Sequence, residues 1–288
     1  MIQDEPLGLS LEPDRSCRHS IGIHASPAEV YQALTDPDLL RRWFVADAEI
    51  DLRPGGAYRW IFGPATGDPN PETLVTTGEF ISVAKQELLR LKAMVEEAET
   101  EVEFRIDPWG DGAILTVTHS GFPGDEEWDD TFRALDRGWQ TEVHVLKLFL
   151  EHGRGLLRHA ERHERRLEAG AEMIFDAFTT SAGLAGWLAD RAAADAIPGG
   201  ELRLEWNGRG VSGHYAVCDP DRFLLMTWEN EPPSLIRVWI DEEEGAAWSD
   251  LKLDHISFGP GQGEVTPFDW TGALGRLAAA LKVVRTAE

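Results

Sequence analysis

The alternation of apolar and polar positions predicts a chain built mainly of β-strands, with a helix that closes each half. In EVEFRI, Val102, Phe104 and Ile106 are apolar and charged residues separate them, as a half-buried strand requires. The same kind of reading predicts further strands at 17–24, 48–52, 57–62, 76–83, 87–95 and 113–119. Apolar residues three and four apart, from Trp139 to Leu150, then predict a long amphipathic helix.

Two short helices are predicted directly after the first strand. Ser26, Pro27 and Glu29 form a capping-box pattern, in which the serine caps the helix, the proline starts it and the glutamate bonds back to the cap. Asp36 and the proline after it start a second helix that ends near Phe44. This order of elements predicts an α+β domain, whose curved antiparallel sheet buries its inner face against the long C-terminal helix.

The chain contains this pattern twice. The motif D-x-x-P-G-G-x-x-R begins at Asp51 and again at Asp195, an offset of 144 in a chain of 288 residues. Further pairs keep the same order at this offset or a slightly shorter one: Ala33 and Ala177, Trp43 and Trp187, His119 and His255, and Trp139 and Trp270. Such self-similarity indicates a tandem duplication of one domain.

We expect the copies to occupy residues 15–152 and 171–284, joined by a charged, helical linker at 153–170. Arginines recur every four residues in this linker, from Arg154 to Arg162, beside glutamates that can pair with them. This spacing is typical of a semi-rigid polar helix. The alternative interpretation is a basic strip that docks on the acidic copies or on a partner.

The first copy resembles the START-like (SRPBCC, Bet v 1-type) domains of the activator of heat-shock-protein-90 ATPase homologue group in four segments: SPAEVYQALTDPDLLRRWF, DLRPGGAYRW, LTVTHSGF and GWQTEVHVLKLFLE. The second copy resembles them more loosely, with S-A-G-L in place of P-x-L-L and I-S-F in place of S-G-F. The resemblance implies two tandem helix-grip domains, a fold that often holds an internal apolar cavity, and no single chemistry across the family.

Aromatic side chains on the predicted inner faces favour a small hydrophobic or aromatic ligand, bound between each sheet and its closing helix. The chain has 11 tryptophans, although core packing accounts for such residues as well as pocket lining does. The candidate ligand-binding residues are Tyr58, Trp60, Phe104, His119, Trp139 and Val143 in the first copy, and Trp206, Trp228, His255 and Trp270 in the second.

The matched histidines have two interpretations. His119 follows the inward positions Leu115 and Val117 at a spacing of two, and His255 follows Leu251 and Leu253 in the same way, so both are expected on an inner face. Each is either a polar group that orients a ligand or a core histidine satisfied by the surrounding protein.

Composition limits the kinds of partner that the protein is expected to bind and the cellular compartment in which it is expected. A net charge of −24 argues against nucleic acid and against anionic membrane surfaces. No apolar run approaches the roughly 18 residues of a membrane span, and the N-terminus lacks a signal-peptide pattern. Cys17 and Cys218 stand one in each copy, which fits a reducing cytosol. We therefore expect a cytoplasmic protein without a cofactor, without a nucleic-acid partner and without membrane insertion.

The common catalytic motifs are absent from the sequence: it has no P-loop, no G-x-S-x-G elbow and no G-x-G-x-x-G. His159 and His163 stand four residues apart but lack the glutamate placement of a zinc-protease helix, so neither a catalytic nor a metal site is predicted.

We therefore expect a non-enzymatic protein that binds a small hydrophobic or aromatic molecule. One alternative is a chaperone-associated module, as the family resemblance suggests. Another is a cyclase- or hydrolase-like enzyme with His119 as its acid–base group. Either one copy binds while the other supports it, or the two copies pack as a pseudo-dimer.

Overall fold

The computed structural model describes residues 15–63, 74–206, 208–229, 232–243, 245–260 and 268–285. The first domain contains strands β1 (Arg15–Ile23), β2 (Asp47–Ile50), β3 (Ala57–Ile61), β4 (Val75–Ala84), β5 (Leu88–Val95), β6 (Ala98–Trp109) and β7 (Gly112–Phe122). Its helices are α1 (Pro27–Thr35), α2 (Pro37–Trp43), the 3₁₀ turn η2 (Glu126–Trp128), α3 (Asp129–Leu148) and the π-helical turn η3 (Phe149–Gly153).

The second domain repeats this order. Its strands are β8 (Leu157–Leu167), β9 (Arg191–Ala194), β10 (Glu201–Trp206), β11 (Arg209–Asp219), β12 (Phe223–Trp228), β13 (Ser234–Glu242) and β14 (Ser249–Gly259). Its helices are α4 (Ala171–Thr179), α5 (Ser181–Trp187) and α6 (Trp270–Arg285). Among the described residues, no helix is both long enough and apolar enough to cross a membrane.

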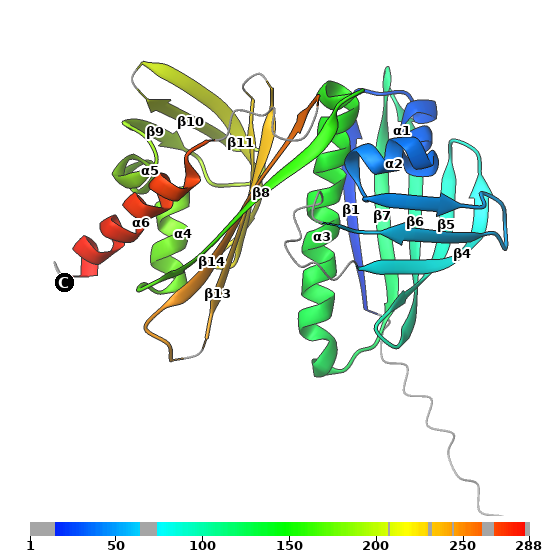
Figure 1. Cartoon of the computed structure of the whole chain (residues 1–288), viewed down its shortest axis with the longest axis horizontal. Helices are drawn as coiled ribbons and strands as arrows, with labels where there is room; N and C mark the ends of the chain where they lie inside the picture. The colour runs from blue at the N-terminus through cyan, green and yellow to red at the C-terminus, as the bar shows by residue number, and fades with distance from the viewer. Residues whose placement is uncertain are drawn as a thin grey trace, which may run out of the picture.

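Both sheets are antiparallel and have the same topology. The strand order is β1-β7-β6-β5-β4-β3-β2 in the first and β8-β14-β13-β12-β11-β10-β9 in the second. Equivalent strands, such as β1 and β8 or β7 and β14, therefore occupy the same place in the two sheets. Figure 1 shows the two sheets and their helices as two α+β domains. The predicted fold class, two tandem helix-grip domains, is confirmed.

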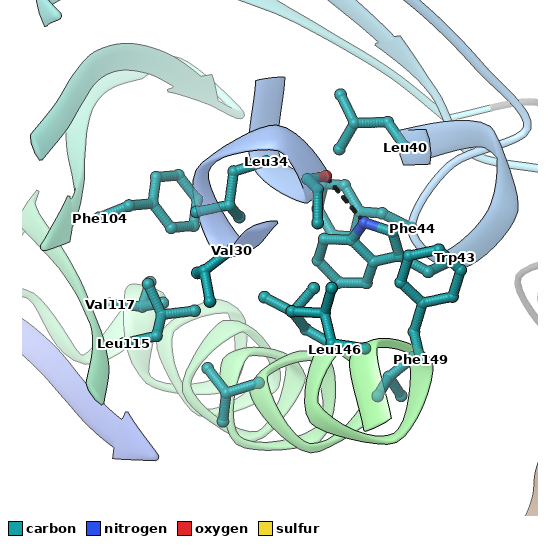
Figure 2. Packing of buried hydrophobic residues seen from close by; sticks show 14 of the residues in the cluster. Val30, Leu34, Leu40, Trp43, Phe44, Phe104, Leu115, Val117, Leu146 and Phe149 are labelled. Carbon is teal, nitrogen blue, oxygen red and sulfur yellow. Dashed lines mark hydrogen bonds between the residues drawn. The ribbon is translucent and has the colours of Figure 1, made fainter. Parts of the chain in front are cut away.

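The two short helices are held together in the same way in both copies. Ser26 accepts a bond from the Glu29 backbone while the Glu29 carboxylate accepts from the Ser26 backbone, which confirms the capping box. The Trp43 indole donates to the Ala33 carbonyl oxygen at 2.9 Å (Figure 2). In the second copy, the matched tryptophan and alanine make the same bond at 2.9 Å, from Trp187 to Ala177.

The repeated P-G-G motif is a turn that only glycine fits. The first glycine of each pair, Gly55 or Gly199, has a positive φ, of 74° and 83° respectively. A Cβ atom on the second glycine, Gly56 or Gly200, would lie 1.9 Å from the backbone oxygen of the aspartate that begins the motif. The two copies therefore share the backbone conformation of this turn as well as its sequence motif.

The predicted helical linker at 153–170 is wrong. Leu157–Leu167 forms β8, the edge strand of the second sheet, which pairs with β14 along its whole length. A spacing of four residues fits a strand as well as a helix, because side chains two or four apart lie on one face of a strand. Arg158, Arg162 and Arg166 accordingly lie on the same face of β8.

Helix α3 lies between the two sheets (Figure 1). None of its residues from Leu135 onward is exposed. Toward the first domain, Val143 and Leu146 join the core that Figure 2 shows between α1, α2 and the first sheet. Just after α3, Phe149 lies against Phe258 of β14, with ring centroids 5.6 Å apart.

The middle of the second sheet is consequently buried on both faces. In β12, Leu224 and Met226 belong to the core of the second domain, whereas Phe223 and Leu225 belong to the core cluster of the first. The outer face contributes three more buried side chains to that first cluster: Leu235, Ile256 and Phe258. The two copies thus form one packed unit through α3, without the symmetry of a pseudo-dimer.

Arginines of the segment 154–166 pair with acids of both domains. Arg154 bonds Glu29 and Arg158 bonds Glu142 in the first domain, while Arg162 bonds Asp254 and Arg166 bonds Asp250 in the second. These contacts agree with the alternative interpretation of a basic strip that docks on the acidic copies. Because β8 belongs to the second sheet, the pair of Arg158 with Glu142 is a polar contact between the two domains.

Arg158 is the buried member of this series, with 6% of its surface exposed. Its guanidinium donates to both Glu142 oxygens, at 2.8 and 3.1 Å, and to the Trp43 carbonyl oxygen at 3.1 Å. We expect Arg158→Met to lower the free energy of unfolding by about 3 kcal/mol, because it leaves the largely buried Glu142 carboxylate unpaired. Urea denaturation measures this change.

The matched control is Arg166→Met, on the same face of the same strand. Its pair with Asp250 is exposed, so its loss should change stability much less than the loss of the Arg158 pair. Equal effects of the two substitutions would contradict the role assigned to Arg158.

Candidate functional site

The six candidate residues of the first domain lie on the inner face of its sheet and on the facing side of α3. Tyr58, Trp60, Phe104 and Val143 are buried in its core cluster, and Trp139 packs against that cluster. His119, 3% exposed, contacts the Trp139 ring. The prediction that these side chains share one interior is therefore right, and whether they bind a ligand is a separate question.

The hydrogen bonds of His119 are complete. Its Nδ1 accepts from the Trp139 indole at 3.0 Å, and its Nε2 lies 2.8 Å from the Thr100 hydroxyl, which itself donates to the Ala93 carbonyl oxygen. Because the indole can only donate, the neutral ring carries its proton on Nε2. Burial lowers the pKa of His119 to about 4, which keeps the ring neutral. His119 is a satisfied core histidine.

The second domain repeats the histidine–tryptophan bond in different surroundings. The Trp270 indole donates to His255 Nδ1 at 3.0 Å. Trp228 lies against both rings, at centroid distances of 5.6 Å from each, and Trp206 lies 6.0 Å from Trp228. Burial, and then the charge of His163, lower the pKa of His255 to about 4. The four candidates of this copy therefore form one aromatic cluster.

Sequence reasoning missed Phe268 in this cluster. Its ring lies 4.7 Å from Trp270, 5.4 Å from Trp228 and 5.7 Å from Trp206. Phe268 stands two residues before the start of α6, where the sequence has no helical or strand periodicity to predict its direction.

Sequence reasoning also missed the polar side of this interior, which β8 supplies. The register pairs Glu161 with His255 and His159 with Ser257, so every second residue from His159 to His163 faces the same way as His255. The repeat could have revealed this strand. At the offset of 144 residues, Arg18 and His19 of β1 match the identical residues Arg162 and His163.

Three buried polar atoms lack hydrogen-bond partners on this face of the described structure. They are the Trp228 Nε1, the His159 Nε2 and the His163 Nε2. Trp228, Ser234, Ser257 and His159 are successive register partners across β12, β13, β14 and β8, so they form one row across the inner face. On the inner face of the first sheet, Trp60 Nε1 is also buried without a hydrogen-bond partner.

A hollow of about 570 Å³ opens between β8 and the start of α6. Its lining comprises Glu161, Arg162, His163, Phe268, Asp269, Trp270 and Thr271. The expected apolar cavity between sheet and helix is not confirmed. A groove of about 840 Å³ in the first domain runs along β2–β6 and contains the candidate residue Tyr58. Its lining combines charged side chains, such as Glu49 and Arg59, with apolar ones, such as Ile50 and Met94. The hollow beside β8 thus adjoins one candidate residue of the second copy, Trp270.

Comparison with known proteins assigns both halves to one kind of domain. A family model described as "Activator of Hsp90 ATPase homolog 1-like protein" matches residues 24–151 and 168–282. No curated protein matches the chain.

Solved structures match one or both halves. DynU16, from the dynemicin biosynthetic locus, is 19% identical over 96% of this chain and 99% of its own, with a TM-score of 0.42. The di-domain ARO/CYC BexL, from the BE-7585A biosynthetic pathway, is 20% identical over 95% of this chain and 93% of its own, with a TM-score of 0.41. Aha1 from Colwellia psychrerythraea, solved as a dimer, is 21% identical over 48% of this chain and 96% of its own, with a TM-score of 0.41.

The two neutral histidines predict a loss of stability in mild acid. The pKa of His119 is about 4 in the folded protein, against 6.5 for an unperturbed histidine. Between pH 6.5 and 4 the unfolded chain therefore binds more protons, so the free energy of unfolding falls as the pH falls, by up to about 3 kcal/mol for His119. Urea denaturation across this pH range measures the slope.

His119→Gln should flatten this slope, because glutamine does not titrate, and His255→Gln should act in the same direction. The exposed His24→Gln is the control for the substitution itself. An unchanged slope in both core variants would contradict the neutral, buried state of these histidines.

Proposed function

The chain belongs to the activator of Hsp90 ATPase homolog 1-like family in both of its halves, and from that premise we propose that it binds a flat, aromatic small molecule in its second domain. The site lies beside His255, Trp270 and Trp228, and the ligand carries an oxygen that accepts hydrogen bonds. The first domain supports the second through α3.

The observation that carries this proposal is the unpaired indole N–H of Trp228. The residue is 3% exposed and its Nε1 has no partner among the described residues. A buried donor without a partner costs about 1–3 kcal/mol, so native proteins rarely keep one without a reason. A carbonyl or phenolic oxygen of a bound ligand would accept this bond, while the surrounding rings would contact its flat faces.

The neighbouring polar atoms indicate the same class of ligand. His159 Nε2 and His163 Nε2 are buried without hydrogen-bond partners, and the nearest acid to His163 Nε2 is Glu161, at 3.9 Å. Ser257 and Ser234 lie in the row that joins His159 to Trp228. An apolar hydrocarbon would leave these atoms unpaired. A ring system with oxygen substituents would satisfy several of them at once.

The first domain is less suited to the same role. Both nitrogens of His119 are engaged within the protein, which favours a structural role for it over that of the acid–base group in a cyclase- or hydrolase-like enzyme. Trp60 Nε1 is unpaired, but no unpaired histidine nitrogen accompanies it on that face of the described residues. We therefore favour binding over catalysis, and the second copy over the first.

Two matched probes test the proposal. We expect 2-acetylnaphthalene to bind about tenfold or more tightly than 2-ethylnaphthalene, because only the first has an oxygen that can accept the Trp228 bond. Trp228→Phe should abolish this preference while keeping an aromatic ring in the cluster. Quenching of tryptophan fluorescence and the shift in melting temperature measure both affinities.

Trp60→Phe is the matched control, since it removes the other unpaired indole N–H, in the first domain. It should leave the preference unchanged. Loss of the preference in this variant alone would move the site to the first domain, and no binding of either probe would contradict the proposal. Native mass spectrometry of freshly purified protein would show whether a ligand of this class co-purifies.

The chaperone hypothesis stays a prediction that rests on the description of the family. Its test is whether the full chain changes the ATPase rate of a purified heat-shock protein 90. A rate unchanged at saturating protein would contradict it.

A further inference from the structure

The first domain holds a group of three metal-ligand side chains outside the proposed binding site. Cys17 and His19 stand two residues apart on β1, and Asp136 faces them from α3. The thiol sulfur, an imidazole nitrogen and a carboxylate oxygen of these residues all lie within 4.8 Å of one another. In the described part of the chain, no other group of histidine, cysteine and acidic residues meets this condition.

We propose that Cys17, His19 and Asp136 bind one zinc ion, with a fourth coordination position left to water. One sulfur, one nitrogen and one oxygen donor is a set that suits zinc, whereas magnesium and calcium prefer oxygen donors alone. Three protein ligands with an open fourth position are typical of zinc sites that take water or a substrate.

The geometry needs little adjustment to take the ion. Around a tetrahedral zinc ion, bond lengths of about 2.0–2.3 Å place neighbouring donor atoms about 3.3–3.6 Å apart. His19 Nε2 and Asp136 Oδ1 are 2.7 Å apart, so they would separate by less than about 1 Å as zinc replaces the proton between them. The ligands stand on a paired strand and a long helix, which hold them in place.

The surroundings also suit an ion. Cys17 is buried, while the side chains of His19 and Asp136 are 16% and 31% exposed, which gives an entry path and a place for water. Zinc binds cysteine as the thiolate, so binding at Cys17 displaces the thiol proton into solvent.

The second copy has kept only part of this arrangement. At the offset of 144, His163 stands where the first copy has His19, but Glu161 replaces Cys17. No group of three ligands forms there among the described residues. A thiolate signature in a metal complex of the full chain can therefore be traced to the first domain.

The test uses the full chain after removal of metals with a chelator. Titration with zinc chloride should show one ion bound per chain with release of the thiol proton, and zinc should raise the melting temperature. Cobalt(II) in place of zinc should give a sulfur-to-cobalt charge-transfer absorption, which only thiolate ligation produces.

Cys17→Ser should abolish the charge-transfer band and weaken zinc binding by about 100-fold or more, since even outer-shell substitutions cost 10- to 100-fold. Asp136→Asn, at a partly exposed position on a helix, should leave the fold intact and weaken zinc binding similarly. Cys218→Ser, which removes the other free thiol, is the matched control and should change neither readout.

Three outcomes would overturn the proposal: no zinc bound at one equivalent, a cobalt complex without the sulfur band, or zinc affinity unchanged in Cys17→Ser. In each case His19 and Asp136 would form a hydrogen-bonded pair only. These outcomes are independent of the naphthalene experiment, since that experiment reports on Trp228 in the other domain.

Discussion

Burial of α3 between two sheets is the constraint on which the rest of the structure depends. A helix that closes one helix-grip domain needs a single apolar side, yet no residue of α3 from Leu135 onward is exposed. Its second side is covered by the outer face of the second sheet, through side chains such as Phe223 and Phe258. The two copies therefore share a helix, and separating the two domains would expose apolar surface of both.

This sharing makes the two copies unequal. The outer face of the first sheet carries ion pairs such as Arg90 with Glu101 and is partly exposed, whereas the middle of the outer face of the second sheet is buried. Burial explains the polar cluster on that face, where Arg162 and Arg237 both bind Asp254. Although burial raises the pKa of Asp254, the charges of Arg237 and Arg162 lower it below its ordinary value, so the carboxylate stays ionised.

The inner faces diverge around one preserved contact. A tryptophan of the closing helix donates to a histidine Nδ1 at 3.0 Å in both domains. In the first, Thr100 completes the bonds of His119, and a cysteine and a histidine lie on the neighbouring edge strand. In the second, the equivalent edge strand, β8, places His159 and His163 on the same face as Trp228, whose Nε1 has no hydrogen-bond partner. The two copies of one fold thus have chemically different interiors, since the polar atoms around the shared histidine–tryptophan contact are hydrogen-bonded in the first and partly unpaired in the second.

The sequence by itself determined the elements and their repetition. Local signals are sufficient there, because the Ser26 cap, the alternation around Phe104 and the glycines of the P-G-G turn each act through neighbouring residues. Only the tertiary structure decided that 157–167 is a strand, since arginines four apart fit either periodicity until β14 pairs with them. It alone also decided which polar atoms stay unpaired, because the partners of His119 and Trp228 come from distant strands and helices. Hydrogen bonding and burial at such positions depend on contacts that no local pattern encodes.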